Sequence, residues 1–419
     1  MPEKIFAIKG DIIFTETNKQ FSTYLQSFLV IKDGIVEGIY KILPEKFNGI
    51  SVSDKGHALI LPGFIDLHTH AAQFNQLGMG MDYKLIDWLS SYTFKEEERF
   101  SSEKYAEKIY RAFAEELINC GTTSAVIFST IHKNSCDILC RILQEKKIPA
   151  YVGKVNMDVN CPSFLCENTA ESLQETEEFI NKWKDNLLIK PIITPRFAPT
   201  SSREQLKGLG DLAVKYNLPV QSHLAENKAE IAWVNELFPE CGAYYKVYEQ
   251  YNLYGQTKTL MAHCIHLTDA EIKHLAKIDV MPVHCPDSNM NLTSGIMPAR
   301  KMLNEGINIG LGSDIGAGHE LFMPNVMVRA IQSSKIYNMQ HNEYKPLSLA
   351  EVFYMATKGC GKFFDNRGSL ENGYQADFLV IDLPEYKQNA SLEERLAYFV
   401  YSGEKKYIKE CYANGKKIS

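Results

Sequence analysis

Hydrophobic residues in the middle of the chain fall into two alternating patterns, short runs of strand length and longer stretches that are helical or loop-like. In residues 101–121 hydrophobic side chains recur at every fourth position, and Gly121 follows the last of them. This helical stripe consists of Tyr105, Ile109, Phe113 and Leu117. The short runs, in chain order, are ILPGFIDLHTH, TSAVIF, AYVGKVNM, LLIKPIIT, LPVQSHL, TLMAHCI, VMPVHC and INIGLGSD.

Eight strands that alternate with helices over roughly 300 residues predict a (β/α)8 TIM-like barrel, an α/β fold. Further helical signals occur in residues 169–186, 201–217 and 268–278. A Rossmann sheet is the rival interpretation. Its only fingerprint is Gly208, Gly210 and Ala213, and these residues lie inside a helical pattern rather than between a strand and a helix.

Strand-like segments also occur at both ends of the chain. KIFAIKGDIIF and SFLVIKDGIVEGI open it, the second with a turn signal at Asp33 and Gly34, and GSLENGYQADFLVIDL follows the last barrel helices. We expect these ends to pair into one small β domain. The predicted division is residues 1–62 and 369–419 for that domain and 63–368 for the barrel.

Composition narrows the class of ligand. The chain has 419 residues, of which 45% are hydrophobic and 23% charged, and its net charge is −6 with no long basic run. These values favour a globular protein with a small-molecule ligand and argue against nucleic acid or a membrane as partner. The absence of a signal-like segment or an 18-residue apolar stretch predicts a cytoplasmic location. The ten cysteines form no CxxC pair, so we expect reduced thiols.

Candidate chemistry begins at the end of the first barrel run, where His68 and His70 alternate. Side chains two residues apart on a strand share a face and are about 6.5 to 7 Å apart. Two imidazoles at the carboxyl end of a barrel strand, the active face of this fold, can therefore converge on one metal ion. Taken alone, the pair is equally compatible with two hydrogen-bonded or solvent-facing histidines.

Other polar residues occupy equivalent strand ends. His223, His263 and Asp314 end the fifth, sixth and eighth runs, and Glu226 follows three residues after His223. Each has an ordinary structural interpretation, namely a hydrogen-bonded histidine, a turn or cap aspartate, and an exposed glutamate at a helix start. Their coincidence on one rim with the histidine pair favours a shared site.

Five separated motifs, FIDLHTH, SHLAEN, MAHCIHL, HCPDSNMNL and GLGSD, resemble in this order the metal-dependent amidohydrolase superfamily, in particular its aminohydrolase branch. The resemblance spans essentially the whole chain. Within that branch, HAAQFNQLGMGMDYKLIDWLSSYTFKEEERF, VGKVNMD, KPIITPRFAPT and QSHLAENKAEI resemble the members that act on guanine. The implied reaction, a step of purine catabolism, is hydrolysis of the C2 amino group of guanine to give xanthine and ammonia.

The resemblance implies a mononuclear zinc site with an open position for water, for which ferrous iron is the alternative metal. Its ligands would be His68, His70, His223 and Asp314. Glu226 would carry protons, His263 would orient the attacking oxygen, and Asp314 would assist proton transfer. A two-metal site would need a bridging lysine, and Lys190 lies too early in its strand for that role.

By the same resemblance, Gln73, Arg196, Phe197 and His263 contact the base, and Arg196 reads the O6 side of the ring. Without the resemblance, Arg196 would be interpreted as a salt bridge, Gln73 as a loop hydrogen bond and Phe197 as core. His284 is expected to support the rim through hydrogen bonds. A homodimer is what the resemblance suggests. The remaining histidines expected to be solvated or structural are His266, His274, His319 and His341.

Three other functions fit parts of this pattern. Another aminohydrolase, acting on a different purine, a pyrimidine or a triazine, would share the metal ligands. A cyclic-amide hydrolase of hydantoinase type would need two metals. A catalytically inactive scaffold would need neither, and the intact ligand set argues against it.

Overall fold

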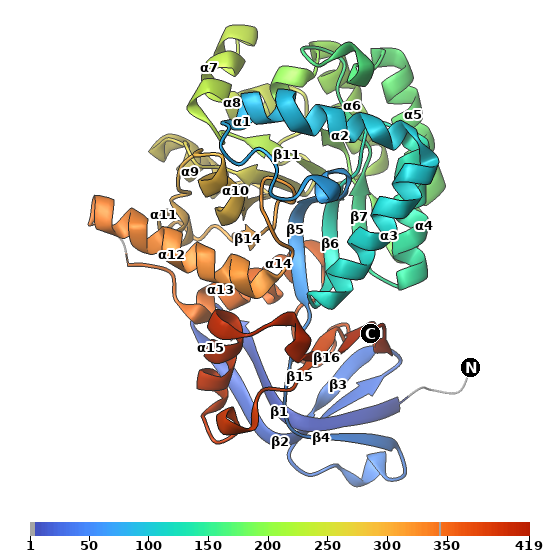
Figure 1. Cartoon of the computed structure of the whole chain (residues 1–419), viewed down its shortest axis with the longest axis vertical. Coiled ribbons are helices and arrows are strands. Elements are labelled where there is room, and N and C mark those ends of the chain that lie inside the picture. Colours follow the sequence, from blue (N-terminus) through green and yellow to red (C-terminus); the bar gives the residue numbers. More distant parts are fainter. Residues whose placement is uncertain (1–4, 343–344) are drawn as a thin grey trace.

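The computed structural model describes residues 5–342 and 345–419. Figure 1 shows two stacked parts, a barrel of strands surrounded by helices and a β-sheet beneath it. The sheet combines blue and red strands, so segments from the two ends of the chain lie side by side.

The barrel contains two sheets of four parallel strands. The first consists of β5 (Phe64–His70), β6 (Thr122–Phe128), β7 (Ala150–Gly153) and β9 (Ile189–Pro191). The second consists of β11 (Val220–Leu224), β12 (Thr259–His263), β13 (Val280–His284) and β14 (Gly310–Leu311). After short breaks, the third and fourth barrel strands continue as β8 (Val155–Asn156) and β10 (Thr194–Pro195).

Two contacts close these sheets into one barrel. Ile193, between β9 and β10, forms a parallel bridge with Val220 of β11. On the other side, the backbone N–H of Asp314 donates to the carbonyl of His68 over 2.8 Å, joining the chain after β14 to β5. The predicted eight-stranded barrel is therefore confirmed.

Helices follow the barrel strands where the hydrophobic stripes predicted them. The helix predicted in residues 101–121 is α3, which begins at Glu103 because the Ser102 side chain accepts from the backbone of Tyr105. The larger helices around the barrel are α3 (Glu103–Asn119), α4 (Lys133–Lys146), α5 (Thr169–Trp183), α6 (Arg203–Tyr216), α7 (Lys228–Leu237), α8 (Tyr244–Gln250), α9 (Asp269–Leu275), α12 (Met323–His341) and α13 (Leu349–Ala356). Shorter helices are α10 (Pro286–Asn291), α11 (Ala299–Asn304) and α14 (Lys358–Gly361).

One helical segment, residues 85–101, crosses over the carboxyl ends of the strands instead of packing on the outside of the barrel (Figure 1). It consists of α1 (Leu85–Trp88), the π-helical turn η3 (Leu89–Thr93), α2 (Phe94–Glu98) and η4 (Arg99–Ser101). Leu85, Trp88, Leu89 and Phe94 are buried beneath it. This segment thus covers the face of the barrel on which the candidate residues lie.

The sheet beneath the barrel has seven strands in the order β17-β16-β15-β4-β1-β2-β3. They are β1 (Ile5–Thr17), β2 (Gln20–Lys32), β3 (Ile35–Tyr40), β4 (Ser51–Pro62), β15 (Phe378–Ile381), β16 (Ile408–Ala413) and β17 (Lys416–Lys417). Lys32 pairs with Ile35, which confirms the predicted turn at residues 33–34. Helix α15 (Leu392–Ser402) also packs on β1 and β2.

The two parts share their main hydrophobic core. Leu59 and Leu61 of β4 and Leu379 of β15 belong to the same buried cluster as Phe113 and Ile127 of the barrel. The division of the chain into a barrel and a β domain at residues 62/63 and 368/369 stays a prediction. Within the described ranges, no helix combines the length and hydropathy needed to cross a membrane, and all ten cysteines, which lie in those ranges, are free thiols.

Candidate active site

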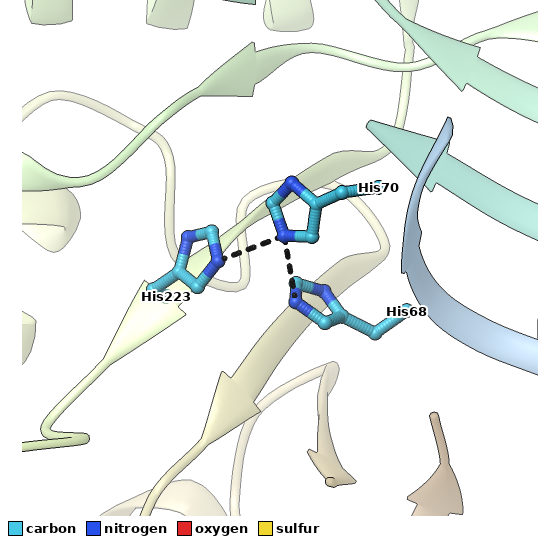
Figure 2. Close-up of side chains that lie close together, drawn as sticks. All are labelled: His68, His70 and His223. Carbon is cyan, nitrogen blue, oxygen red and sulfur yellow. Dashed lines mark hydrogen bonds between the residues drawn. The ribbon is translucent and has the colours of Figure 1, made fainter. Parts of the chain in front are cut away.

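Three imidazoles meet at the carboxyl ends of two barrel strands. His68 and His70 end β5, and His223 lies on β11. Figure 2 shows their rings turned toward one another, with the Nε2 atom of His70 3.3 Å from the Nε2 atoms of both His68 and His223. One ring proton cannot satisfy two imidazole acceptors at once, so a shared cation accounts for this arrangement better than hydrogen bonds do.

Local features of β5 and β14 bring the pair into place. Between Asp66 and Thr69, β5 has one residue more than the β6 segment it pairs with, which is a bulge of the kind that re-aims side chains next to active sites. Gly312 passes so close that a Cβ atom there would lie 2.7 Å from the Cβ of His68. Only glycine therefore fits beside this histidine.

Asp314 supplies a carboxylate to the same cluster. Its Oδ1 lies 3.2 Å from Nε2 of His68 and 3.4 Å from Nε2 of His70. Two ligand atoms bound to one zinc ion at 2.0 to 2.1 Å with tetrahedral angles are about 3.3 Å apart. Four donor pairs of this cluster match that spacing, so the residues present fit a zinc ion.

Hydrogen bonding and burial keep the imidazoles suitable as ligands. The backbone carbonyl of Arg196 accepts from Nδ1 of His223 over 2.6 Å, which leaves the lone pair of Nε2 free. Burial lowers the pKa of His68 and places the pKa values of His70 and His223 well below the ordinary value. Neutral imidazoles are the form that binds a metal.

Beside this cluster lies an acid–base pair. Oε2 of Glu226 is 3.4 Å from Nε2 of His263, which is 3.7 Å from Oδ2 of Asp314. Burial raises the pKa of Glu226 to about 7, although Ser294 donates to its Oε1 over 2.9 Å. Burial alone would lower the pKa of His263, but the carboxylates of Glu226 and Asp314 outweigh it and raise that pKa. The glutamate is therefore poised to exchange protons near neutral pH.

Residues around the cluster orient it. Nδ1 of His263 is 2.9 Å from Oδ1 of Asn289 on α10. The carboxylate of Asp66 accepts from the backbone of His68 over 3.2 Å and from the backbone of Ser313 over 3.0 Å. It thereby ties the first and last barrel strands together at the site. Such supporting hydrogen bonds fix the rotamers of metal ligands and catalytic groups.

The backbone at the site adopts conformations that non-glycine residues seldom take. Positive φ values of 51°, 73°, 47° and 48° occur at Ala225, His263, Cys264 and Asp314. All four lie at or just beyond the carboxyl end of a barrel strand. Strain of this type clusters at functional sites, where the surrounding structure holds it in place.

A pocket lies above these residues, with about 420 Å³ of space that includes the part open to solvent. The polar wall consists of His70, Gln73, Arg196, His223, Glu226, Glu230, His263, Ser288 and Asp314. The apolar wall consists of Leu85, Trp88, Leu89, Phe197, Leu292 and Ala317. All the candidate residues except His68 line this pocket, and His68 lies beneath it against His70 and Asp314.

All four predicted base-contacting residues lie at this wall. Three of them, Arg196, Gln73 and Phe197, also have the contact that their ordinary interpretation expects. Arg196 forms a buried ion pair with Glu97. Gln73 donates from Nε2 to the same carboxylate over 2.9 Å and accepts from the backbone of Gly316 over 3.2 Å. Phe197 packs edge-on against Trp233 in a hydrophobic cluster.

The structure adds two residues that sequence reasoning missed. Glu97 lies in a charged run that is typical of a solvated helix face, but it is buried at the pocket. Glu230 accepts from the backbone N–H groups of Glu226 and Asn227 over 2.9 and 3.0 Å. The N-x-x-E pattern of a capping box could have identified Glu230, since Asn227 caps α7 and Glu230 completes the box.

Two predictions about neighbouring residues can be compared with the structure. The Nζ of Lys190 is 3.5 Å from the backbone carbonyl of Lys184 on the barrel exterior, consistent with a structural or solvated lysine. The hydrogen bonds expected of His284 are not seen at its Nδ1, which has no partner among the described residues. Burial lowers the pKa of His284 to about 3, so it stays a neutral, buried ring at the end of β13.

A candidate metal site on the active face of a TIM-like barrel, with an acid–base pair beside it, is typical of metal-dependent hydrolases. The Amidohydrolase family matches residues 59–418, and this chain belongs to that family. Among its relatives, the guanine deaminase of Dictyostelium discoideum is 37% identical over 88% of this chain and 86% of its own length.

Two further relatives bear on the substrate. The guanine deaminase from C. acetobutylicum, whose crystal structure has guanine bound in the active site, superposes with a TM-score of 0.98 and 47% identity, covering 99% of this chain and 100% of its own. A 5-methylthioadenosine/S-adenosylhomocysteine deaminase of Nitratidesulfovibrio vulgaris is 30% identical over 80% of this chain and 74% of its own length.

Proposed function

We propose that this chain catalyses the hydrolytic deamination of guanine to xanthine and ammonia. The observation that carries the proposal is the placement of Glu226 and His263 beside the three imidazoles and Asp314 in one pocket. The similarity to a protein with guanine bound in its active site supports the choice of substrate. In this reaction a water oxygen replaces the amino group at C2, and N3 gains a proton.

We infer that one zinc ion per chain is held by His68, His70, His223 and Asp314, with ferrous iron as the alternative. The support is the spacing of their donor atoms and the neutral state of the imidazoles. When bound, such an ion lowers the pKa of a coordinated water toward about 7. Lys190 lies away from this cluster, which favours a single metal.

Glu226 carries the first proton. Its carboxylate takes a proton from the attacking water as the oxygen adds to C2, and delivers that proton to N3 of the ring. A carboxyl group whose pKa is near 7 can both accept and release a proton at neutral pH. Ser294 donates to the Glu226 side chain, and the Glu230 carboxylate accepts from the backbone N–H of Glu226, so both the side chain and its loop are held for this transfer.

His263 and Asp314 complete the reaction. The two carboxylates favour the protonated form of His263, whose Nε2–H donates to the oxygen that has added at C2. Asp314 accepts the remaining proton of that oxygen and passes it to the amino group. The C2–N bond then breaks, ammonia leaves, and the oxygen forms the C2 carbonyl of xanthine.

Recognition of the base falls to other residues of the pocket wall. Arg196 donates to the carbonyl O6, which adenine lacks, while Gln73 and Phe197 contact the ring. Arginine cannot lose its proton, so it presents only donors. A substrate without an acceptor at this position would leave a buried donor unpaired, which discriminates strongly.

The test measures metal content and turnover together. We expect one metal per chain, with guanine loss followed by ultraviolet absorbance and matched by xanthine and ammonia. The Glu226→Gln variant should keep its metal and lose about 10²- to 10⁴-fold in kcat. Glu236→Gln, an exposed position on α7, is the matched control. Full activity of Glu226→Gln would exclude the proton-transfer role.

The second candidate is a different aminohydrolase of the same fold, which the similarity to the Nitratidesulfovibrio vulgaris deaminase favours. A panel of guanine, adenosine-like compounds, pyrimidines and triazines separates the two. Turnover of another heterocycle without turnover of guanine would retain the metal site and overturn the substrate. Two metals per chain would favour a hydantoinase-type hydrolase, and absence of any turnover would favour an inactive scaffold.

The proposal also includes a homodimer, which the family resemblance suggests, and a cytoplasmic location, which is expected from the sequence. Sedimentation of the purified chain tests the first, and fractionation of cells tests the second. A monomer at micromolar concentration would exclude the dimer without affecting the proposed reaction.

A further inference from the structure

The charged run Lys95–Arg99 is not uniformly exposed. Lys95 and Arg99 face solvent, but the carboxylates of Glu96 and Glu97 are buried beneath α2. Glu96 binds neighbouring residues of its own segment, since it accepts from Arg99 and Tyr105. Glu97 instead pairs with Arg196, so α2 places one buried carboxylate against a residue of the pocket wall.

Glu97 holds both of the polar residues assigned to the base. Its Oε2 accepts from Nη1 of Arg196, and its Oε1 accepts from Nε2 of Gln73 over 2.9 Å. The side chains of Glu97 and Arg196 are 3% and 4% exposed, so the ion pair is shielded from water. A single carboxylate therefore sets the relative position of the two groups.

The orientation of the Gln73 amide is fixed from both ends. The backbone N–H of Gly316 can only donate, so the Gln73 atom that faces it is Oε1. Nε2 then faces Glu97, which can only accept in its ionised form. One hydrogen of this amide and one lone pair remain available to a ligand.

The guanidinium of Arg196 is constrained in the same way. Glu97 occupies Nη1, and the ring of Phe94, also on α2, lies 5.2 Å from the Cζ atom. Because the guanidinium is a rigid planar fork, fixing one edge and one face directs its remaining N–H groups. The pair is neutral as a whole, so it offers donors to a neutral base without a net positive charge that would attract anions.

We propose that Glu97 is a positioning residue that sets specificity for a neutral purine base with a carbonyl group at C6. This inference rests on the proposed function, because it assigns to Arg196 the O6 side of the ring. Glu97 acts through Arg196 and Gln73 and does not touch the reacting atoms.

Binding measurements on two unreactive ligands test the inference apart from turnover. Hypoxanthine carries the C6 carbonyl and purine lacks it, and neither has an amino group at C2. Calorimetry gives a Kd for each. We expect the wild-type protein to bind hypoxanthine about 10- to 100-fold more tightly than purine, as for one hydrogen bond to a charged group.

Glu97→Gln keeps the shape of the side chain, but its amide nitrogen would face a donor of Arg196 or Gln73. We expect the ratio of the two Kd values to fall at least about tenfold, mainly through weaker binding of hypoxanthine, with purine affinity changed less than about threefold. In guanine turnover, KM should rise more than kcat falls. Glu98→Gln, at the next position of the same helix, is the matched control and should keep both Kd values.

Glu97→Asp keeps the charge that Arg196 needs but withdraws the carboxylate by one methylene, so it serves if Glu97→Gln fails to fold. It should lower the ratio in the same direction. Equal weakening of both ligands in a folded variant would indicate a purely structural role and overturn the inference, as would an unchanged ratio. If the wild-type protein prefers hypoxanthine but does not turn over guanine, the proposed function fails while the specificity role of Glu97 stands.

Discussion

Two buried arginine–carboxylate pairs differ in what the rest of the arginine contacts. In the lower sheet, Nη1 of Arg395 on α15 binds Asp11 of β1 over 2.7 Å, and its Nη2 donates to the carbonyl of His57. At the pocket, Arg196 pairs with Glu97, and the guanidinium also forms part of the pocket wall. The first pair connects protein segments, and the second presents donors to a cavity.

The two pairs differ in what their polar atoms bind. Burying an ion pair costs solvation free energy. Each pair is therefore expected either to have a role beyond stability or to have its polar atoms fully hydrogen-bonded by the protein. Asp11 also accepts from the backbone and the side-chain amide of Gln26, so protein groups bind both of its oxygens, while the buried Nε of Arg395 has no partner among the described residues. Around the pocket, by contrast, Arg196 and Gln73 bind Glu97 and also line a cavity. Variants at the pocket should therefore cost function, and variants in the sheet should cost stability.

The largest functional effect is expected at the proposed metal ligands. His223→Asn removes one of the three converging imidazoles, so metal content should fall well below one equivalent. Changes outside the ligand shell typically cost about 10- to 100-fold, and we expect loss of a ligand to lower kcat/KM by more than about 10³-fold. Elemental analysis and the ultraviolet assay measure both. His341→Asn, exposed at the end of α12, is the control, and full metal retention in His223→Asn would contradict the site.

In the sheet, Asp11→Asn should cost stability. It leaves the buried guanidinium of Arg395 without its counter-charge, which typically costs about 3 to 5 kcal/mol in the free energy of unfolding. Urea denaturation measures this loss, while kcat/KM of the folded protein should be unchanged. If Asp11→Asn loses activity only in proportion to its unfolded fraction, the contrast between sheet and pocket is supported. If the fully folded variant loses turnover, the contrast is contradicted.

The same pair has a defined pH dependence. Burial alone would raise the pKa of Asp11, but the hydrogen bond from Arg395 and those from Gln26 hold it below the ordinary value of 3.8. A carboxyl group with a lowered pKa in the folded state stabilises the fold above its unfolded-state pKa. That contribution is lost as the pH falls through the folded-state pKa. Asp11→Asn should therefore unfold with a weaker dependence on pH between 5 and 2 than the wild-type protein.

That the proposed metal ligands lie close together could be predicted from sequence, because the place of a residue on its strand fixes its place in the barrel. In a closed parallel barrel every carboxyl end lies on one rim, so His68, His223 and Asp314 needed only a correct strand assignment. The extra residue in β5 was not visible, since a bulge leaves no signature in a run of hydrophobic and polar letters. The outer half of β4 was missed for a related reason: SVSDKGH is mostly exposed and lacks the alternation of a half-buried strand.

Glu97 was missed because it stands in the charged run KEEER, and a run of this kind is typical of a solvated helix face. Phe94, Glu97 and Phe100 recur at intervals of three, and all are buried. A glutamate between two aromatic residues on one helical stripe is a signal for a buried carboxylate. Its partner Arg196 lies 99 positions away in sequence, and no local pattern connects the two.

Glu230 shares features with both pairs. Its carboxylate is hydrogen-bonded by protein groups, as in the sheet, but it also contacts the proposed catalytic residue Glu226 at the pocket. It accepts from the backbone of Glu226 and, over 2.7 Å, from the hydroxyl of Tyr244. Burial is the largest cause of the raised pKa of Glu226, and the negative charge of Glu230 adds to it. Glu230→Gln removes that charge, so Glu226 should stay deprotonated to lower pH.

The wild-type acid limb of kcat/KM should accordingly have an apparent pKa above the ordinary glutamate value of 4.5, and the limb of Glu230→Gln should lie at lower pH. We also expect about a 10-fold loss of kcat/KM at its optimum, from a loosened Glu226 loop. Tyr244→Phe keeps the charge and loses only the hydroxyl, so it should lose less activity and leave the limb in place. If the acid limbs of the wild type and of Glu230→Gln coincide, the charge of Glu230 does not raise the pKa of Glu226.

The smallest expected effect sharpens the comparison most directly. The hydroxyl of Ser288 is buried at the pocket wall and has no hydrogen-bond partner among residues 5–342 and 345–419. Ser288→Ala therefore breaks no hydrogen bond within the protein, and the free energy of unfolding should be unchanged.

If the Ser288 hydroxyl instead hydrogen-bonds to a ligand, the Kd of Ser288→Ala for hypoxanthine should be about two- to tenfold higher than that of the wild-type protein, the range of one neutral hydrogen bond. Ser294→Ala is the matched contrast, because that hydroxyl donates to Glu226 and its loss should lower kcat rather than affinity. Loss of stability without loss of affinity in Ser288→Ala would give this hydroxyl a structural role, like the pair in the sheet. It would also show that an unpartnered group at the pocket wall is not by itself a contact for the base.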